Sequence, residues 1–326
     1  MFTKAGKTSF LSKLGLSAAL AMMALSAYAA PPTTVVVAFP PGGPADTLAR
    51  VVAKQLEGPL GSSVIVENKP GGNGAIAANY VKRAAPDGHT LFLSSAGAIS
   101  INPMLYQHLT YNPEKDFAPI AMLVSTPEVL VVPATGHVKS VKDFLDLAKS
   151  KKEGVTLSSS GIGSMPHMAI SLLRIATKAN ILHVPYKGAA PAIRDTVAAQ
   201  VGGFFGDISG LLPFIQQHKL TAIGIAASKR SAKLPGVPTF DELGFNNVYA
   251  SNWYGIFAPA GTPKNTIDAL NKAMRIAMAS ADVKKYVATS GVEAAVDSPD
   301  EFAKTIQDDS KKWGALIKAE NITVNE

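Results

Sequence analysis

Short runs of β-branched and aliphatic residues alternate with amphipathic helical patterns in this chain, and this alternation constrains its fold more than any other feature. Strand-like runs occupy residues 33–39, 64–66, 90–93, 120–124 and 129–132, and apolar residues at helical spacing occupy residues 46–56 and 74–82. Neighbouring parallel strands need a crossover connection, which is usually a helix. The alternation therefore predicts an α/β fold, with parallel sheets covered by helices on both faces.

The same alternation restarts after Pro133 and changes character near the C-terminus. In the second run, helical patterns cover residues 141–148, 167–176 and 189–199, and strand patterns cover residues 155–157, 181–184, 203–205 and 220–226. A strand-like run at residues 253–257 precedes three helical patterns, at residues 263–279, 282–289 and 299–319. Because no long flexible linker separates the two runs, we expect two lobes packed around a shared cleft.

The first 29 residues have the pattern of a secretory signal peptide. Lys4, Lys7 and Lys13 precede an apolar stretch at residues 14–25, and a small-x-small sequence at residues 27–29 follows. The alternative, a transmembrane anchor, needs about 20 apolar residues, and this stretch is shorter. We therefore expect export to the periplasm and a mature, soluble chain that begins at residue 30.

Charge and cysteine content exclude several functional classes. The chain has 31 Lys and Arg against 24 Asp and Glu, and its formal charge of +7 falls to +4 without the three N-terminal lysines. So mild an excess, without a long basic cluster, does not favour nucleic acid as a partner. The absence of cysteine excludes a disulfide framework, a thiolate zinc site, an iron–sulfur cluster and a catalytic cysteine.

Common enzyme motifs are also missing. The chain has no Gly-x-Ser-x-Gly elbow and no Gly-Lys-Ser/Thr after a glycine-rich loop, and none of its six histidines lies four residues from another. Residues 72–77 match the Gly-x-Gly-x-x-Ala form of a dinucleotide site, but the next strand ends in residues 93–96 without an acid for the ribose. We therefore expect no cofactor, no metal site and no enzymatic activity.

Two loops rich in Gly, Ser and Pro follow strand ends and lead into helices, at residues 39–46 and 158–164. Ligands of open α/β sheets bind in crevices at such strand ends, and a helix N-terminus there favours an anion. Turn formation and helix capping explain either loop alone, whereas two matching loops, one in each lobe, favour a shared anion site. Asp46 is expected to orient its loop, since a carboxylate repels an anion.

At these loops the chain resembles the substrate-binding proteins of tripartite tricarboxylate transporters, often called Bug receptors. The resemblance covers nearly the whole mature chain. It rests on six blocks in the same order, at residues 39–50, 66–91, 160–167, 183–188, 229–239 and 253–263. Any one of these blocks is weakly specific, and their common order makes the resemblance strong.

The resemblance implies a type II periplasmic-binding-protein-like fold, in which each lobe is a mostly parallel sheet flanked by helices and the ligand cleft lies between the lobes. By analogy, the first lobe holds residues 30–131 and 254–326, and the second holds residues 132–253. The chain would cross twice between the lobes and form a hinge there.

The resemblance also implies a carboxylate ligand held by backbone N–H groups, hydroxyls and ordered waters, without an arginine clamp. It assigns Phe39, Pro41, Gly42, Gly43 and Ala45 to one jaw, with Asp46 beside them, Ser94, Ser95 and Ala96 to the floor, and Ser160, Gly161, Gly163 and Ser164 to the other jaw. His167, Tyr186 and Gly188 would lie behind or beside the ligand, and for His167 and Tyr186 packing within the lobe is the alternative. Asp207 fits the pattern loosely.

These features predict a non-enzymatic periplasmic receptor that captures a small organic carboxylate and delivers it to the membrane permease of a tripartite transporter. A receptor that presents the ligand to a membrane sensor kinase needs the same site. An exported hydrolase on this fold is a third hypothesis, without a nucleophile–base pair near the jaws. We expect a monomer, and the sequence leaves open whether the ligand is an aliphatic di- or tricarboxylate, an aromatic acid or an amino acid.

Overall fold

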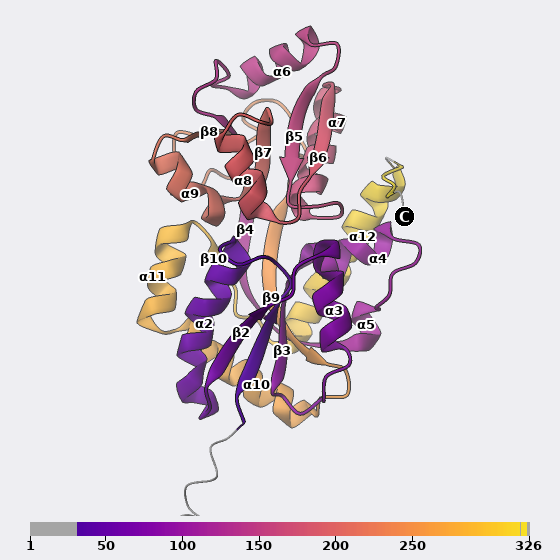
Figure 1. Cartoon of the computed structure of the whole chain (residues 1–326), viewed down its shortest axis with the longest axis vertical. Coiled ribbons are helices and arrows are strands. Elements are labelled where there is room, and N and C mark those ends of the chain that lie inside the picture. The colour runs from indigo at the N-terminus through magenta and orange to yellow at the C-terminus, as the bar shows by residue number, and fades with distance from the viewer. Residues whose placement is uncertain (1–30, 320, 325–326) are drawn as a thin grey trace, which may run out of the picture.

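The computed structural model describes residues 31–319 and 321–324, and the predicted signal peptide at residues 1–29 lies outside them. Figure 1 shows two lobes, one above the other, with long strands running between them. Strands and helices alternate within each lobe. The two-lobed α/β fold predicted from the sequence is thus confirmed.

The first lobe is built on three parallel strands, in the spatial order β2 (Val64–Asn68), β1 (Thr33–Val37) and β3 (Thr90–Ser95). Its helical segments are α2 (Pro44–Leu60), η1 (Gly72–Gly74), α3 (Ala75–Val81), η2 (Gly97–Ile101), α4 (Asn102–Leu105), α5 (Pro113–Asp116), α10 (Lys264–Met278), α11 (Ala281–Ser290) and α12 (Pro299–Ala319). Helices α2 and α10 cover one face of this sheet, where the buried Leu48 and Met274 belong to one apolar cluster.

The second lobe repeats the plan with the parallel strands β7 (Gly203–Asp207), β5 (Val155–Ser159) and β6 (Ile181–Pro185). Its helices are α6 (Val141–Ser150), α7 (Met165–Thr177), α8 (Ala189–Val197) and α9 (Ile208–Gln216). Strand β8 (Leu220–Ile225) adds to this sheet by pairing antiparallel with β4. The upper lobe in Figure 1 is formed by these elements.

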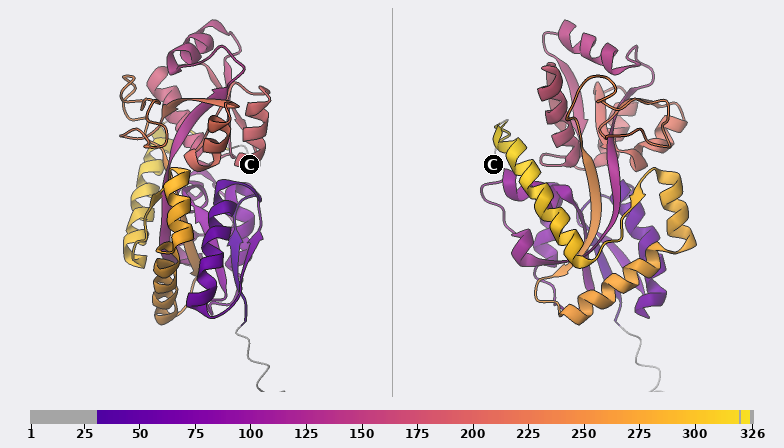
Figure 2. Two further views of the ribbon diagram at one scale, coloured as in Figure 1. Left: turned by 90° about the vertical axis from the view of Figure 1, so that its left-hand side faces the viewer. Right: turned by 180° about the vertical axis from the view of Figure 1, so that it is seen from behind.

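Strands β4 (Phe117–Pro133) and β9 (Ser251–Pro259) connect the lobes. Strand β4 pairs antiparallel with β9 as far as Pro127, and from Glu128 onward it pairs with β7 of the second lobe. The short strand β10 (Glu293–Ala294) also pairs with β4. Seen from behind in Figure 2, β4 and β9 run side by side between the lobes. The residue limits expected for each lobe remain a prediction.

The sequence predicted two separate strands at residues 120–124 and 129–132, and this prediction is wrong. The structure has one continuous strand of 17 residues, β4. Polar residues between the two apolar runs suggested a break, but Thr126 and Glu128 are both buried on the strand. Helix α9 was not predicted either, because its nine residues are apolar on most sides and contain Pro213.

None of the helices in the described part of the chain has both the length and the hydropathy that a membrane crossing requires.

Candidate functional site

A small cavity lies between the lobes, where strands β1, β5 and β7 end. Its volume is about 30 Å³. The first lobe contributes Phe39, Pro40, Gly43, Pro44, Ala45, Asn73, Ser95 and Tyr254, and the second contributes Ser160, Ser164, Met165, Pro166, Ala189, Ala190, Phe204, Gly206, Asp207 and Asn252. A second hollow of about 240 Å³ shares Phe39, Pro40, Asn73 and Ser160 with it and reaches Tyr186 and Gly188. We call the two together the interlobe cleft.

The loop between β1 and α2 forms the wall of the cleft on the first lobe. Gly42 has φ of +80°, and Pro44 occupies the first turn of α2. The buried Asp46 carboxylate accepts hydrogen bonds from Gly42 N at 3.0 Å, Arg50 Nε at 3.0 Å and Asn68 Nδ2 at 2.9 Å. Burial raises the Asp46 pKa, but these hydrogen bonds outweigh it and leave the pKa below its usual value. Asp46 therefore stays ionised and orients the loop.

The loop between β5 and α7 forms the opposite wall. Ser164 is the N-cap of α7, where its Oγ accepts from His167 N and donates to Gly161 O at 2.6 Å. The N–H of Gly161 donates to Ser159 Oγ at 3.2 Å, and Gly161 has φ of +143°. These bonds fold the loop back on itself and fix the Ser160 segment at the cleft.

Two histidines support this second loop from behind. The rings of His167 and His183 stack with their centroids 4.1 Å apart and an interplanar angle of 10°. His183 Nε2 lies 2.6 Å from Ser159 Oγ, and His167 Nδ1 accepts from Gly163 N at 3.2 Å. Burial lowers the pKa of His167 to about 3 and that of His183 to about 4. Both imidazoles are therefore neutral near pH 7 and hold the loop by hydrogen bonds.

Three helices begin at the cavity, namely α2, α7 and α8. Their first residues, among them Ala45, Met165 and Ala189, contribute to its lining. The N–H groups of a first helical turn have no partner within the helix, and the helix dipole places partial positive charge there. Hydroxyl groups of Ser95 and Ser160 line the same space. The arrangement can therefore bind an anion with donors from both lobes.

Glycines allow the walls of the cleft to approach closely. A Cβ atom on Gly188 would lie 2.8 Å from Pro40 Cδ, and one on Gly210 would lie 2.8 Å from Pro44 Cγ. Gly188 also has φ of +112°, which L side chains rarely adopt. In both cases the glycine belongs to the second lobe and the proline to the first, so these positions set how far the lobes close.

A cluster of acidic and hydrogen-bonding groups forms the inner end of the cavity. Asp207 accepts hydrogen bonds from Tyr254 Oη and from Asn252 Nδ2, the latter at 3.2 Å. Glu128 is the register partner of Asp207 on β4. Burial raises the pKa of Asp207 to about 6, although the bonds from Tyr254 and Asn252 lower it in part. Burial and the charge of Asp207 hold the Glu128 pKa well above its usual value.

The structure brings together most of the site residues expected from the sequence. Those on the wall of the interlobe cleft are Phe39, Gly43, Ala45, Ser95, Ser160, Gly161, Ser164, Tyr186, Gly188 and Asp207. Those away from its wall are Pro41, Gly42, Asp46, Ser94, Ala96, Gly163 and His167. Ser94 precedes Ser95 on β3, Ala96 follows the end of the strand, and both are fully buried. Ligand contact for any of these residues remains a prediction.

Several cleft residues were missed by the sequence reasoning. Asn252 and Tyr254 lie two apart on β9, so that both face the cavity, and Asn73 reaches it from η1. The alternation of side chains along a strand links Asn252 to Tyr254, but no local pattern indicates that β9 passes beside Asp207. The sequence also did not predict that His167 stacks on His183, which lies sixteen residues away on a different element.

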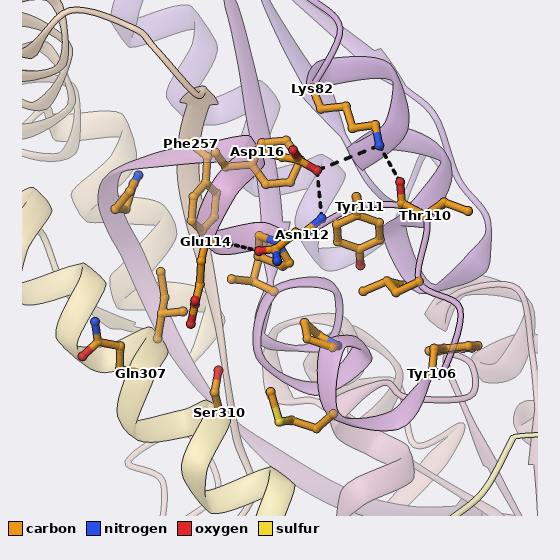
Figure 3. A pocket seen from close by; sticks show the side chains of 18 of the residues that line it. Lys82, Tyr106, Thr110, Tyr111, Asn112, Glu114, Asp116, Phe257, Gln307 and Ser310 are labelled. Carbon is orange, nitrogen blue, oxygen red and sulfur yellow. Dashed lines mark hydrogen bonds and ion pairs between the residues drawn. The ribbon is translucent and has the colours of Figure 1, made fainter.

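A larger hollow of about 830 Å³ lies elsewhere, between α12 and the segment that contains α4 and α5. Figure 3 shows it closely, with Lys82 directed toward Thr110 and Asp116 and with Gln307 on the opposite side. The Lys82 Nζ–Asp116 Oδ2 distance is 3.9 Å, and Lys82 also donates to the Thr110 carbonyl oxygen. Its lining residues all belong to the first lobe, and one of them, Tyr106, also lines the 240 Å³ hollow of the interlobe cleft.

Two lobes joined by crossing strands, with a cleft lined from both, define a solute-binding protein of the periplasmic type. Comparisons with known proteins identify the family. The family described as "Tripartite tricarboxylate transporter family receptor" matches residues 48–322. The chain belongs to this family, as the resemblance of its motifs suggested.

Individual relatives agree with this assignment. Protein BugT of Bordetella pertussis is 32% identical over 310 residues, which cover 95% of this chain and 94% of BugT. The structure of MatC from Rhodopseudomonas palustris with bound malate is 32% identical, has a TM-score of 0.83, and is matched over 88% of this chain and 99% of MatC. An R. palustris protein with adipate is 28% identical with a TM-score of 0.86, over 89% of this chain and 97% of that protein. The family and these structural neighbours are solute-binding proteins.

Proposed function

We propose that this protein is a periplasmic receptor that captures a small organic carboxylate between its lobes and delivers it to the membrane permease of a tripartite transporter. The observation that carries the proposal is the convergence of the first turns of α2, α7 and α8 on one cavity. We call the cavity of about 30 Å³ the inner cavity, and no Lys or Arg lies among the described residues that line it. Backbone N–H groups and hydroxyls therefore supply the donors for an anion.

The bound ligands of two structural neighbours support a carboxylate. MatC was determined with malate and the second R. palustris protein with adipate. Both ligands are small organic acids with carboxylates at their ends. The family description and the predicted signal peptide support periplasmic location and a membrane permease as partner.

Hydrogen bonds alone can supply the affinity that a receptor needs. A hydrogen bond to a charged group contributes about 1.5–3 kcal/mol. Four or five such bonds, less the cost of association, reach the roughly 8 kcal/mol of micromolar binding.

Capture requires the lobes to move. A cavity of about 30 Å³ has roughly the volume of one water molecule, so a carboxylate enters only when the walls separate. The two crossing strands allow such a hinge motion, and a ligand that contacts both walls favours the closed arrangement. Closure around the ligand also gives the permease a distinct shape to recognise.

A thermal-shift panel on ligand-stripped protein tests the proposal. The protein is unfolded and refolded to remove bound solute, and then mixed with mono-, di- and tricarboxylates, aromatic acids, amino acids, sugars and amines. Ligand at about 100 times its Kd adds about 2.7 kcal/mol of stability, which is a shift of several degrees. We expect a shift with one class of acid and none with sugars or amines. A flat response to every acid contradicts the proposal.

Delivery to a permease needs a separate experiment. We expect that deleting this protein or its permease abolishes uptake of the radiolabelled acid to the same extent. Uptake that persists without this protein, together with loss of a transcriptional response to the acid, would instead assign it to a sensor kinase.

A further inference from the structure

The inner end of the interlobe cleft carries a pair of buried acids. Asp207, which is 7% exposed, is the one residue with a carboxyl group among the described residues that line the inner cavity. Glu128 is fully buried directly beside it, as its register partner across the β4–β7 ladder. Neither Glu128 oxygen accepts a hydrogen bond from another donor among the described residues, and a proton on Glu128 is donated to Asp207. One carboxyl group thus lines a cavity that otherwise suits an anion, and a second is buried beside it.

Among the described residues, no cationic side chain acts on the pKa of Asp207 or Glu128. The positive end of a helix dipole lies at Asp207, which is the N-cap residue of α9, but its side chain makes no capping hydrogen bond. The groups that act on the Asp207 pKa, apart from burial, are Tyr254, Asn252 and Glu128. On α11, Tyr286 lies near Asp207, and its pKa is raised mainly by burial and further by the charge of Asp207. None of these side chains is cationic. A buried carboxylate without a counter-charge is costly unless it holds a proton or a ligand supplies the charge.

Aromatic rings surround the same space. Phe39, Phe204 and Tyr254 all line the inner cavity together with Asp207. The rings of Phe39 and Tyr254 meet edge to face, with their centroids 6.4 Å apart. Cationic nitrogen groups bind well where aromatic rings and a carboxylate meet, because both attract positive charge and the rings tolerate a poorly hydrated cation. The rings and the acid pair lie at the same cavity, and together they suit a cationic group.

We propose that the ligand is a zwitterion, whose carboxylate lies at the first turns of α2, α7 and α8 and whose cationic nitrogen lies against Asp207. This inference rests on the proposed function, since it names the ligand class of the same cleft. Diacids would place a second carboxylate beside Asp207 and Glu128, and like charges at short range repel. The cleft thereby selects amino carboxylates over plain diacids of the same length.

Matched acids test the inference on the unaltered protein. For each chain length, titration calorimetry compares the unsubstituted acid, the diacid, the hydroxy acid, the amino acid and its trimethylammonium analogue. We expect an amino or trimethylammonium acid to bind at least about tenfold more tightly than its diacid and hydroxy counterparts, a difference of about 1.4 kcal/mol. Equal or tighter binding of the diacid or hydroxy acid overturns the inference and leaves the proposed function standing. If no acid binds, both the inference and the proposed function are contradicted.

Proton exchange on binding gives a second readout. Near pH 6, Asp207 is partly protonated in the ligand-free protein, because its pKa is about 6. A cation beside it favours the ionised form, so that binding of a zwitterion releases protons to the buffer. Calorimetry in two buffers of different ionisation enthalpy measures this release. Proton uptake on binding of the preferred ligand overturns the inference.

Substitution of Asp207 completes the test. Asp207→Asn keeps the shape and removes the charge, and we expect it to weaken the zwitterion at least about tenfold while the unsubstituted acid changes less than about twofold. Asp146→Asn, on the exposed face of α6 where Asp146 pairs with Lys142, is the matched control. If Asp207→Asn weakens both acids equally, the inference is overturned. If the Asp207→Asn variant does not fold, the comparison of acids and the proton measurement on the unaltered protein still test the inference.

Discussion

Asp207 lies opposite Glu128 in the antiparallel β4–β7 ladder, and it is also hydrogen-bonded by Tyr254 of β9. One carboxyl group at the base of the cleft is therefore in contact with both strands that cross between the lobes. We therefore expect a ligand that touches Asp207 to couple binding to lobe closure through this contact.

The acid pair makes stability depend on pH. A carboxyl pKa raised by burial contributes stability below its usual value, and this contribution is lost as pH rises through the folded-state value of about 6. We expect the double variant Asp207→Asn/Glu128→Gln to gain several degrees of Tm relative to the ligand-free wild type between about pH 4 and pH 7. Thermal unfolding across this range measures the difference. A Tm difference that is constant with pH contradicts the raised pKa.

The contact of Gly188 with Pro40 predicts a closure defect. In Gly188→Ala, the new methyl group meets Pro40 at about 2.8 Å and the residue keeps a φ of +112°, which costs on the order of 1–3 kcal/mol. We expect ligand affinity to fall at least about tenfold, by calorimetry, because the methyl group obstructs the closed arrangement. Gly236→Ala is the control, since nothing lies within 4 Å of its Cβ position. Equal affinities of the two variants would rule out this role for Gly188.

The histidine pair predicts a structural role for His183. His183→Ala removes the partner of Ser159 Oγ and the ring stacked on His167. We expect a loss of about 1–3 kcal/mol in unfolding free energy and a weaker ligand complex, because the Ser160 loop loses its support. His183→Gln, which offers Ser159 a hydrogen-bond partner, recovers part of the loss. The exposed His137→Ala is the control, and His183→Ala with unchanged stability contradicts this account.

The hydrogen bonds of Asp46 predict that this residue stabilises the first-lobe wall of the cleft. Asp46→Ala removes the carboxylate that accepts hydrogen bonds from Gly42, Arg50 and Asn68. We expect the loss of this acceptor to lower the free energy of unfolding by about 1–3 kcal/mol. Because the Asp46 pKa is lowered, its contribution is present at neutral pH and is lost as pH falls below about 4. Chemical denaturation at pH 7 measures the change, with Asp146→Ala as control. An Asp46→Ala variant as stable as the control would contradict the orienting role.

The sequence predicted the α/β class and both cleft loops because these features are local. The glycine and proline pattern at residues 39–46 directly reflects the turn into α2, where Gly42 has φ of +80°. Serine at position 164 likewise reflects the N-cap of α7. Such signals depend on a few neighbouring residues, and the alternation of strands and helices depends on periodicity that is visible in the chain itself.

Features that arise from distant contacts were not predictable in the same way. Tyr254 and Asp207 are 47 residues apart, and nothing near either residue shows that they are hydrogen-bonded. Strand β4 was divided in the prediction because Thr126 and Glu128 are polar, whereas the fold buries both. Burial of a carboxyl group is a property of the assembled lobes. Asp207 was expected at the site from the sequence, but its pairing with the buried Glu128 was found only in the structure.

A crystal structure of the protein with its best-binding acid tests the central claim most directly. We predict a ligand carboxylate in the interlobe cleft, within hydrogen-bonding distance of the first turns of α2 and α8 and of the Ser160 hydroxyl. We also predict that both lobes contact the ligand. A ligand found in the first-lobe hollow beside Glu114 and Gln307, with the interlobe cleft holding only water, would contradict it.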